Sequence, residues 1–376
     1  MSKLNIAVIG GGIAGLSVSF RLAKMGHKVS IYDPAAAKGA SYAAAGMLAP
    51  ASEVNFSEIP LLRLMQRSGE MWKSFASEIE LIAGMNIGYR TEGTLLIGFD
   101  QNDASELKRI CEFQREFGIE VTQLSRSLVK ELEPNLNASV SFVSLIRSDH
   151  QVDNRQLLKA LITSLQKFGV DIVNSLVTAI HRNSNNRYSF SLQNGEKHEP
   201  DVLILAPGAM TDTIGGLPDE ISAAIRPVKG QIIRVISKEK NLLSHVLRAE
   251  VANQSVYLVP RCTGEIVIGA TQEEVGFDDT AKIRPIAELL ANACRVLPAI
   301  GEAHFAEQLV RYRPGSVDNA PIIGQYYETN LYLSLGYFRH GILLSAALSE
   351  YLAQAIETGK SPPEILEFGP MRLTNS

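Results

Sequence analysis

The sequence LNIAVIGGGIAGLSVSFRLAKMGHKVSIYDP, residues 4–34, decides the fold. Residues 4–9 form an apolar run, which is typical of a strand buried on both faces. A helical pattern follows the glycines and ends near Gly26, and residues 28–32 predict a second strand that Asp33 and Pro34 stop. This stretch therefore predicts a β-α-β unit at the start of a parallel sheet.

The glycines of this unit predict a binding site for a dinucleotide. Gly10 permits a tight turn, Gly12 lets the backbone approach a pyrophosphate, and Gly15 lets the helix pack close to the sheet. The positive end of the helix then favours the phosphates. Asp33 ends the second strand, where its carboxylate can accept hydrogen bonds from an adenosine ribose. FAD and NAD both fit this segment.

Composition excludes several classes of protein. The chain has 376 residues, with 36 Lys and Arg against 40 Asp and Glu, a formal net charge of −4. This ordinary globular composition shows no basic footprint for nucleic acid. No apolar run reaches the ~18 residues of a membrane span, and the N-terminal stretch lacks the features of a secretory signal peptide. Three widely separated cysteines predict neither disulfides nor a metal site, so we expect a cytoplasmic protein.

The remaining patterns predict two kinds of structure. Helices are expected over about 58–83, over 103–117 with Asp103 and Glu106 at capping-box spacing, over 156–168 and over 286–296. Short strands are expected at 87–90, and at 188–192 and 202–205 around a turn at 194–195. From residue 226 onward, alternating and β-branched runs favour an antiparallel sheet. Because β-α-β patterns lie on both sides of the antiparallel ones, we expect interleaved domains.

Several further blocks resemble one family. Residues 43–50, AAAGMLAP, resemble a flavin-contacting segment of the D-amino-acid-oxidase-like FAD-dependent oxidoreductases. The blocks that follow in that family's order are RPVKGQ (226–231), VYLVPR (256–261), IGAT (268–271), RPGS (313–316) and GYFRHGILL (336–344). The resemblance extends over nearly the whole chain and is weakest over 51–148.

The resemblance implies a mixed α/β fold, in which a Rossmann-like FAD-binding domain is interleaved with an antiparallel-sheet substrate domain. The expected boundaries are 1–83, 150–220 and 318–363 for the FAD-binding domain, 84–149 and 221–317 for the substrate domain, and 364–376 for a C-terminal tail.

The resemblance also implies that FAD is bound without a covalent link. Ala43 stands where some relatives attach the flavin through His, and no Cys follows Cys294. Small residues let the backbone lie close to the flavin, and the helix start at Gly341 can present N–H groups to the flavin edge where reduction builds negative charge. The expected FAD contacts are Gly10, Gly12, Ile13, Ala14, Gly15, Asp33, Pro34, Ala40, Ser41, Ala45, Gly46, Met47, Val177, Tyr337, Phe338, Arg339, His340, Gly341, Ile342 and Leu343.

Three residues are implied as substrate contacts. Arg313 matches the family's carboxylate-binding arginine, and the planar fork of Arg suits a carboxylate because it forms two charge-assisted hydrogen bonds. Tyr257 matches a tyrosine that assists at the same carboxylate, and Arg339 matches a position near both flavin and substrate. Hydride transfer requires no protein acid or base, so none is expected. His340 is expected to be packed, and Glu53 could face the amine.

The implied activity is oxidative deamination of a small amino acid or amine. A hydride passes to flavin N5, and the products are a 2-oxo acid, ammonia and, with molecular oxygen as acceptor, hydrogen peroxide. The blocks match best the branch of the family that oxidises glycine for thiamine thiazole synthesis. A dehydrogenase of D-amino acids or secondary amines that uses a quinone or carrier stays open, as does the flavin subunit of a larger amine oxidase complex. The sequence also leaves open a homo-oligomer.

Overall fold

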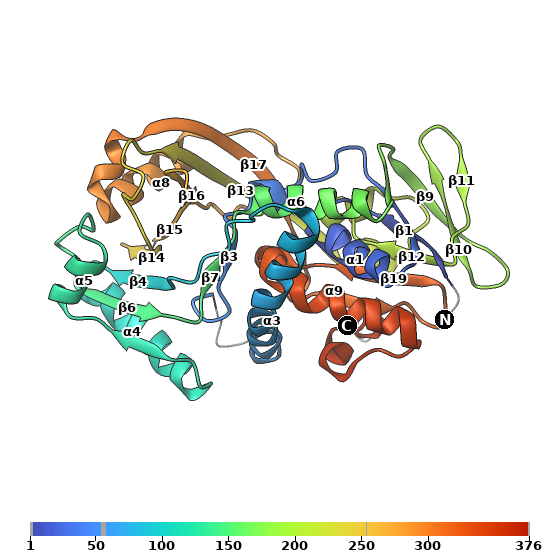
Figure 1. Cartoon of the computed structure of the whole chain (residues 1–376), viewed down its shortest axis with the longest axis horizontal. Helices are drawn as coiled ribbons and strands as arrows, with labels where there is room; N and C mark the ends of the chain where they lie inside the picture. Colours follow the sequence, from blue (N-terminus) through green and yellow to red (C-terminus); the bar gives the residue numbers. More distant parts are fainter. Residues whose placement is uncertain (1–2, 54–57, 253, 375–376) are drawn as a thin grey trace.

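The computed structural model describes residues 3–53, 58–252 and 254–374. The molecule is elongated, with one large β-sheet toward each end and helices between them (Figure 1). The mixed α/β fold with several sheets is therefore confirmed. Residues 1–2 and 54–57 of the predicted FAD-binding domain, 253 of the predicted substrate domain and 375–376 of the predicted tail lie outside the described residues.

A six-stranded sheet contains the predicted β-α-β unit. Its strand order is β18-β19-β12-β1-β2-β8, and all neighbouring pairs are parallel except β18 with β19. The strands are β1 (Asn5–Ile9), β2 (Lys28–Tyr32), β8 (Asp171–Val173), β12 (Val202–Leu205), β18 (Ile322–Gln325) and β19 (Leu331–Leu335).

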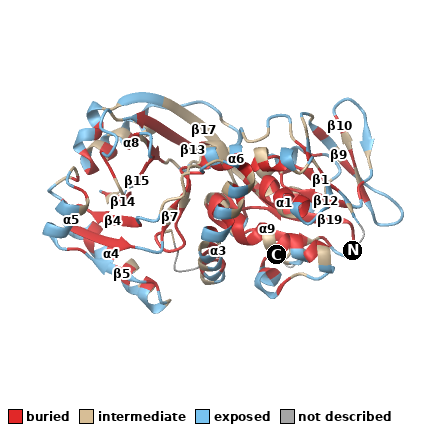
Figure 2. Ribbon diagram, viewed as in Figure 1, coloured by how far each residue is buried: buried red, intermediate tan, exposed pale blue. Residues whose placement is uncertain are grey.

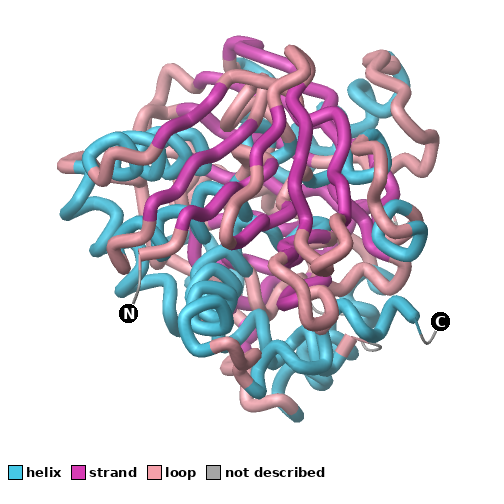
Figure 3. Tube along the Cα trace, turned by 90° about the vertical axis from the view of Figure 1, so that its right-hand side faces the viewer, coloured by secondary structure: helices cyan, strands magenta, loops and turns pink. Residues whose placement is uncertain are grey.

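Both faces of this sheet are buried, which explains the continuous apolar run of β1. Ile6 and Val8 pack into the core cluster beneath the helices, while Ala7 and Ile9 pack into a second cluster. The helices are α1 (Ile13–Lys24), α3 (Ile59–Ala83), α6 (Asn154–Lys167) and α9 (Gly341–Thr358). The opposite face is covered by a small antiparallel sheet of β9 (Val177–Arg182), β10 (Tyr188–Leu192) and β11 (Lys197–His198). Figure 3 views this end of the molecule, with strands gathered in the centre.

An eight-stranded sheet forms the other end, in the order β17-β13-β16-β15-β14-β4-β6-β5. All neighbouring pairs are antiparallel except β14 with β4. The strands are β4 (Thr94–Gly98), β5 (Val121–Gln123), β6 (Phe142–Ile146), β13 (Ile225–Ile236), β14 (Val246–Val251), β15 (Gln254–Pro260), β16 (Glu265–Gly269) and β17 (His304–Ser316). The helices that pack on it are α4 (Gln101–Glu116), α5 (Arg126–Leu132) and α8 (Ile283–Val296).

Short elements connect the two ends. The helix α2 (Ala40–Ala43) precedes β3 (Met47–Leu48), which pairs with β7 (His150–Gln151); α7 (Asp219–Ser222) is a further short helix. The 3-10 turns include η3 (Phe338–His340), which leads directly into α9. Burial is concentrated in the sheets and in α9, whose residues are buried around most of its circumference (Figure 2). We propose the two large sheets as the centres of the two predicted domains.

Three local predictions are wrong in detail. The capping box of α4 is formed by Asp100 and Asp103, one turn earlier than predicted, because each side chain accepts the other residue's backbone N–H. Residues 87–90 form no strand, and only Arg90 makes an isolated bridge, with Gln151. The turn at 194–195 joins β10 to β11, because β12 enters the six-stranded sheet beside β1.

Candidate active site

The turn between β1 and α1 leaves no room for side chains at two glycines. Gly10 has φ +106°, and a Cβ there would lie 2.2 Å from the Ala206 carbonyl oxygen. A Cβ at Gly15 would lie 1.9 Å from the Gly10 carbonyl oxygen. Gly10 and Gly15 thus shape the turn without lining the cavity described below, whereas Gly12 lines it directly. Gly12, the N-cap residue of α1, has no side chain that could cap the helix, so the positive helix end stays open to a ligand.

Asp33 lies where the sequence places it, at the end of β2, and lines the same cavity. Its carboxylate accepts hydrogen bonds from the backbone N–H of Gly11 (2.6 Å) and of Ala35 (2.7 Å). The side chain therefore also ties the glycine turn to the following strand. Pro34 and Val177 do not line the cavity, and Val177 is buried in the cluster beneath the small antiparallel sheet.

Residues 41–47 form another wall of the cavity, and they are called the flavin loop below after the flavin contact that the sequence predicts for them. The Ser41 hydroxyl accepts a hydrogen bond from the N–H of Ile13 (3.0 Å), which joins this loop to the start of α1. Gly46 has φ +76°, and a Cβ there would lie 2.0 Å from the Val152 carbonyl oxygen. Only glycine fits such a position.

The cavity has a volume of about 560 Å³ and passes between the two large sheets. It brings together most of the residues that the sequence predicts. The predicted residues that line it are Gly12, Ile13, Ala14, Asp33, Ala40, Ser41, Ala45, Gly46, Met47, Tyr257, Arg313, Tyr337, Phe338, Arg339, Gly341 and Ile342.

Two predicted contacts of the last segment lie behind the cavity wall. His340 is buried, and Leu343 uses its carbonyl oxygen to accept hydrogen bonds from Ser68 (2.6 Å) and Trp72 (2.7 Å) on α3. These bonds fix the first turn of α9, so that Gly341 and Ile342 face the cavity.

The eight-stranded sheet contributes a tyrosine and an arginine that contact each other. Tyr257 is on β15 and Arg313 on β17, and a side-chain hydrogen bond joins them. Arg313 also donates to the Thr271 carbonyl oxygen (3.0 Å). Glycines make room for both side chains: a Cβ at Gly230 would lie 2.6 Å from Arg313, and one at Gly269 would lie 2.3 Å from the Tyr257 hydroxyl. Burial raises the pKa of Tyr257, although the Arg313 cation opposes the shift, so the phenol stays protonated.

Several ionisable side chains surround Glu53, which lies beside Tyr257 and Arg313. The Glu53 carboxylate accepts from Arg248 (2.8 Å) and lies 3.3 Å from His340 Nδ1. Burial opposes ionisation of Glu53, but the hydrogen bond from His340 and the Arg248 cation lower its pKa to about 2. Burial lowers the pKa of His340, although Glu53 opposes this shift. Arg339 donates to the Glu58 carboxylate (3.1 Å) and to the Glu53 carbonyl oxygen (3.4 Å).

Arg248 lines the cavity but was not predicted from the sequence. It lies directly opposite Tyr257 in the pairing of β14 with β15. Directly opposed residues of an antiparallel pair project from the same face. Predicting from the sequence that β14 and β15 form a hairpin would have placed Arg248 beside Tyr257.

Two absences apply to the described part of the chain. Within residues 3–53, 58–252 and 254–374, no helix has both the length and the apolar character needed to cross a membrane. The same residues contain no cluster of three or more His, Cys, Asp or Glu side chains that could hold a metal ion.

The chain belongs to the FAD dependent oxidoreductase family, whose model matches residues 5–355. It is therefore an enzyme whose cofactor is FAD. The site fits that cofactor, because a helix N-terminus with glycine at its N-cap, a wall of small residues and Asp33 line one continuous cavity.

Individual relatives are similar over nearly the full chain. Glycine oxidase of Geobacillus kaustophilus is 28% identical over 373 residues, which cover 98% of this chain and 97% of that protein. The crystal structure of glycine oxidase from the same organism covers 99% of each chain with a TM-score of 0.89 at 28% identity. A bifunctional protein ThiO/ThiG of Synechocystis is 29% identical over 371 residues, and this chain spans about half of it, 54%.

Proposed function

We propose that this enzyme oxidises glycine, or another small amino acid or amine, to an imine that hydrolyses to a 2-oxo acid and ammonia. Molecular oxygen takes up the two electrons and becomes hydrogen peroxide. The observation that carries the proposal is the hydrogen-bonded pair of Arg313 and Tyr257 at the cavity wall. The name of the glycine oxidase relative supports glycine as substrate, and the name of a relative from Rhizobium etli, a putative thiamine biosynthesis oxidoreductase ThiO, supports thiamine biosynthesis as the pathway.

In this proposal Arg313 holds the substrate carboxylate. Its guanidinium is oriented by the Thr271 carbonyl and by Tyr257, so its fork is fixed before substrate arrives. The protonated Tyr257 hydroxyl donates a further hydrogen bond to the same carboxylate. FAD, when bound, supplies the two-electron acceptor at its N5 atom.

Glu53 supplies negative charge where the amine of the substrate would lie. Because Arg248 and His340 hold it ionised, it attracts an ammonium group but has no proton to give. Gly341 and Ile342 at the start of α9 direct the positive end of that helix toward the cavity, where the accepted electrons build negative charge. We nominate no protein acid or base.

The test is reduction of the purified yellow protein without oxygen. Glycine, sarcosine and a set of D-amino acids are added separately, and flavin bleaching is followed by its absorbance. Admission of oxygen should then restore the colour and yield one hydrogen peroxide per flavin. Bleaching without peroxide would favour transfer to a quinone or carrier, and no bleaching by any amine would contradict the proposal.

A further inference from the structure

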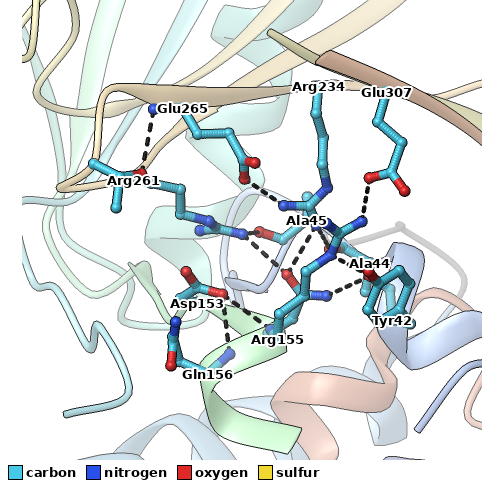
Figure 4. A network of polar contacts seen from close by, with 12 residues as sticks. Tyr42, Ala44, Ala45, Asp153, Arg155, Gln156, Arg234, Arg261, Glu265 and Glu307 are labelled. Carbon is cyan, nitrogen blue, oxygen red and sulfur yellow. Dashed lines mark hydrogen bonds and ion pairs between the residues drawn. The ribbon is translucent and has the colours of Figure 1, made fainter. Parts of the chain in front are cut away.

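The flavin loop is held on its far side by a buried polar network (Figure 4). The Asn154 side-chain amide donates to the carbonyl oxygens of Ser41 (2.8 Å) and Tyr42 (2.9 Å). Arg234 donates to the carbonyl oxygen of Ala44 (3.4 Å), and Arg261 donates to that of Ala45 (2.5 Å). Four carbonyl groups of the flavin loop thus point at side chains that do not line the cavity.

Asn154 joins the two arginines to each other. Its side-chain oxygen accepts one hydrogen bond from Arg234 and one from Arg261, each 3.2 Å long. Arg234 is on β13, Arg261 follows β15, and Asn154 begins α6. All three are buried, with exposed fractions of 1%, 5% and 0%. Side chains from both ends of the molecule therefore meet behind the flavin loop.

Acidic groups offset the charge of the buried arginines. Arg234 forms an ion pair with Glu265, and Asp153 lies near enough to Arg261 to favour its charged form. Breaking such a buried network by removing one partner is strongly destabilising. We therefore expect stability losses as well as any effect on the flavin, and the experiment below separates the two.

Peptide geometry determines what the opposite side of the flavin loop presents. In a trans peptide the carbonyl of one residue and the N–H of the next point in opposite directions. Because the carbonyls of Ala44 and Ala45 face the arginines, the N–H groups of Ala45 and Gly46 face away from them. Both residues are buried and line the cavity, and within the described residues neither N–H has a protein acceptor. A buried N–H without an acceptor costs about 1–3 kcal/mol, which favours an acceptor on a ligand.

We propose that Arg234, Arg261 and Asn154 are positioning residues that aim the N–H groups of Ala45 and Gly46 at the flavin ring. The fork of Arg261 matters as well as its charge, because one terminal nitrogen donates to the Ala45 carbonyl and to Asn154 while the other donates to the Gln151 side chain (3.3 Å). This arrangement stabilises negative charge on the ring and raises the reduction potential of the flavin. The inference rests on the proposed function and on the predicted placement of the flavin against this loop.

The test compares four proteins saturated with FAD: the unmutated enzyme, Arg261→Gln, Arg261→Lys and the control Arg21→Gln. Arg21 is an arginine of α1 whose side chain is 11% exposed; it pairs with Glu78 and Glu350 and does not line the cavity. The readouts are the two-electron midpoint potential and the dissociation constant of sulfite, which adds at flavin N5 and places negative charge on the ring. Neither readout involves an amine.

For Arg261→Gln we expect at least tenfold weaker sulfite binding and a midpoint potential lower by about 30 mV or more, the tenfold equivalent for two electrons. Arg261→Lys should recover less than half of this loss on a logarithmic scale, since the single nitrogen of an ammonium cannot replace both arms of the guanidinium fork. Arg21→Gln should lower the Tm with sulfite binding within twofold of the unmutated enzyme. Unchanged sulfite binding and potential in both Arg261 variants would overturn the inference, and so would full recovery by lysine.

Ala45→Pro separates failure of this inference from failure of the flavin placement. It removes one of the two N–H groups and leaves the arginines intact, and Ala44 has ψ 150°, the conformation preferred before proline. We expect weaker sulfite binding than in the unmutated enzyme. If Ala45→Pro alters sulfite binding and the Arg261 variants do not, only the positioning inference fails. If Ala45→Pro has no effect either, the flavin does not face this loop and its predicted placement fails too, whereas amine oxidation is tested separately by the bleaching experiment.

Discussion

The two ends of the cavity are built in different ways. The end near Gly12 and Asp33 is made mainly of backbone groups and small residues of the segment 12–47, with residues 206–210 beside it. The end near Arg313 is made of charged and hydroxyl side chains from strands far apart in sequence, with Glu53 and Arg248 facing Tyr257 and Arg313. We call these the nucleotide end and the amine end. The comparison indicates that the first end depends on local sequence, whereas the second depends on how the eight-stranded sheet is assembled.

The first prediction concerns how the nucleotide end holds FAD. All of the flavin should be released into the supernatant when the protein is precipitated with acid. The reason is that small residues and backbone groups form this wall, and none of the three cysteines lines the cavity. The measurement is the flavin absorbance of supernatant and pellet. Flavin that remains in the pellet would show a covalent link and contradict a site built on backbone contacts.

The second prediction removes the main cation of the amine end. Arg313→Ala should leave FAD bound and lower kcat/KM for glycine by about a hundredfold or more, because it removes two charge-assisted bonds worth roughly 1.5–3 kcal/mol each. Arg313→Lys should recover only part of the activity, since an ammonium lacks the planar fork.

A substrate without a carboxylate provides the control for Arg313. Methylamine should be a poor substrate of the unmutated enzyme, and its kcat/KM should hardly change in Arg313→Ala. Equal losses for glycine and methylamine would show that Arg313 is a structural residue and that the amine end lies elsewhere.

The contrast between the two ends also explains what the sequence could predict. The β-α-β unit and its glycine pattern depend on contacts within a few dozen residues, so the local structure of the nucleotide end could be predicted, and the FAD contacts assigned to it stay a prediction. Arg313 and Tyr257 were found through resemblance to a family, not through spacing. Arg248 was missed because its role depends on the register of β14 with β15. The buried network of Arg234, Arg261 and Asn154 depends on three separate elements meeting, which no local pattern encodes.

The third prediction tests the one acidic side chain that the sequence assigned to the nucleotide end. Asp33→Ala should weaken FAD binding about tenfold to a hundredfold, the equivalent of one charge-assisted bond of roughly 1.5–3 kcal/mol. With FAD at saturation, kcat should stay within about twofold, because the ribose lies far from the reacting atoms. Titration of the apoprotein with FAD measures the affinity.

Asp171→Ala is the matched control, since Asp171 is an exposed acid on β8 of the same sheet. It should bind FAD as the unmutated enzyme does. Unchanged affinity in Asp33→Ala would restrict Asp33 to its structural hydrogen bonds with Gly11 and Ala35.

The last prediction concerns Asp149, which lies beneath the amine end and should make the stability of the fold depend on pH. Asp149 is buried and accepts hydrogen bonds from the N–H groups of Ala51 (3.0 Å) and Ser52 (3.1 Å), so it supports the segment that carries Glu53. Burial raises the pKa of Asp149 to about 6 from an ordinary value of 3.8; its hydrogen bonds oppose the shift and Glu53 adds to it. The folded state therefore binds more protons than the unfolded state between these values, and stability falls as pH rises from about 4 to 6.

Replacement by Asn cannot ionise and keeps one of the two acceptor oxygens, and the loss of the second hydrogen bond is the same at every pH. Relative to the unmutated enzyme, Asp149→Asn should therefore gain roughly 1–3 kcal/mol of unfolding free energy between pH 4 and pH 7. Urea unfolding followed by circular dichroism at a fixed excess of FAD measures this difference. Asp212→Asn, which replaces an exposed acid, should show the same pH dependence of the unfolding free energy as the unmutated enzyme. If Asp149→Asn shows the same pH dependence as the unmutated enzyme, Asp149 titrates normally. Burial and the nearby Glu53 would then not raise its pKa.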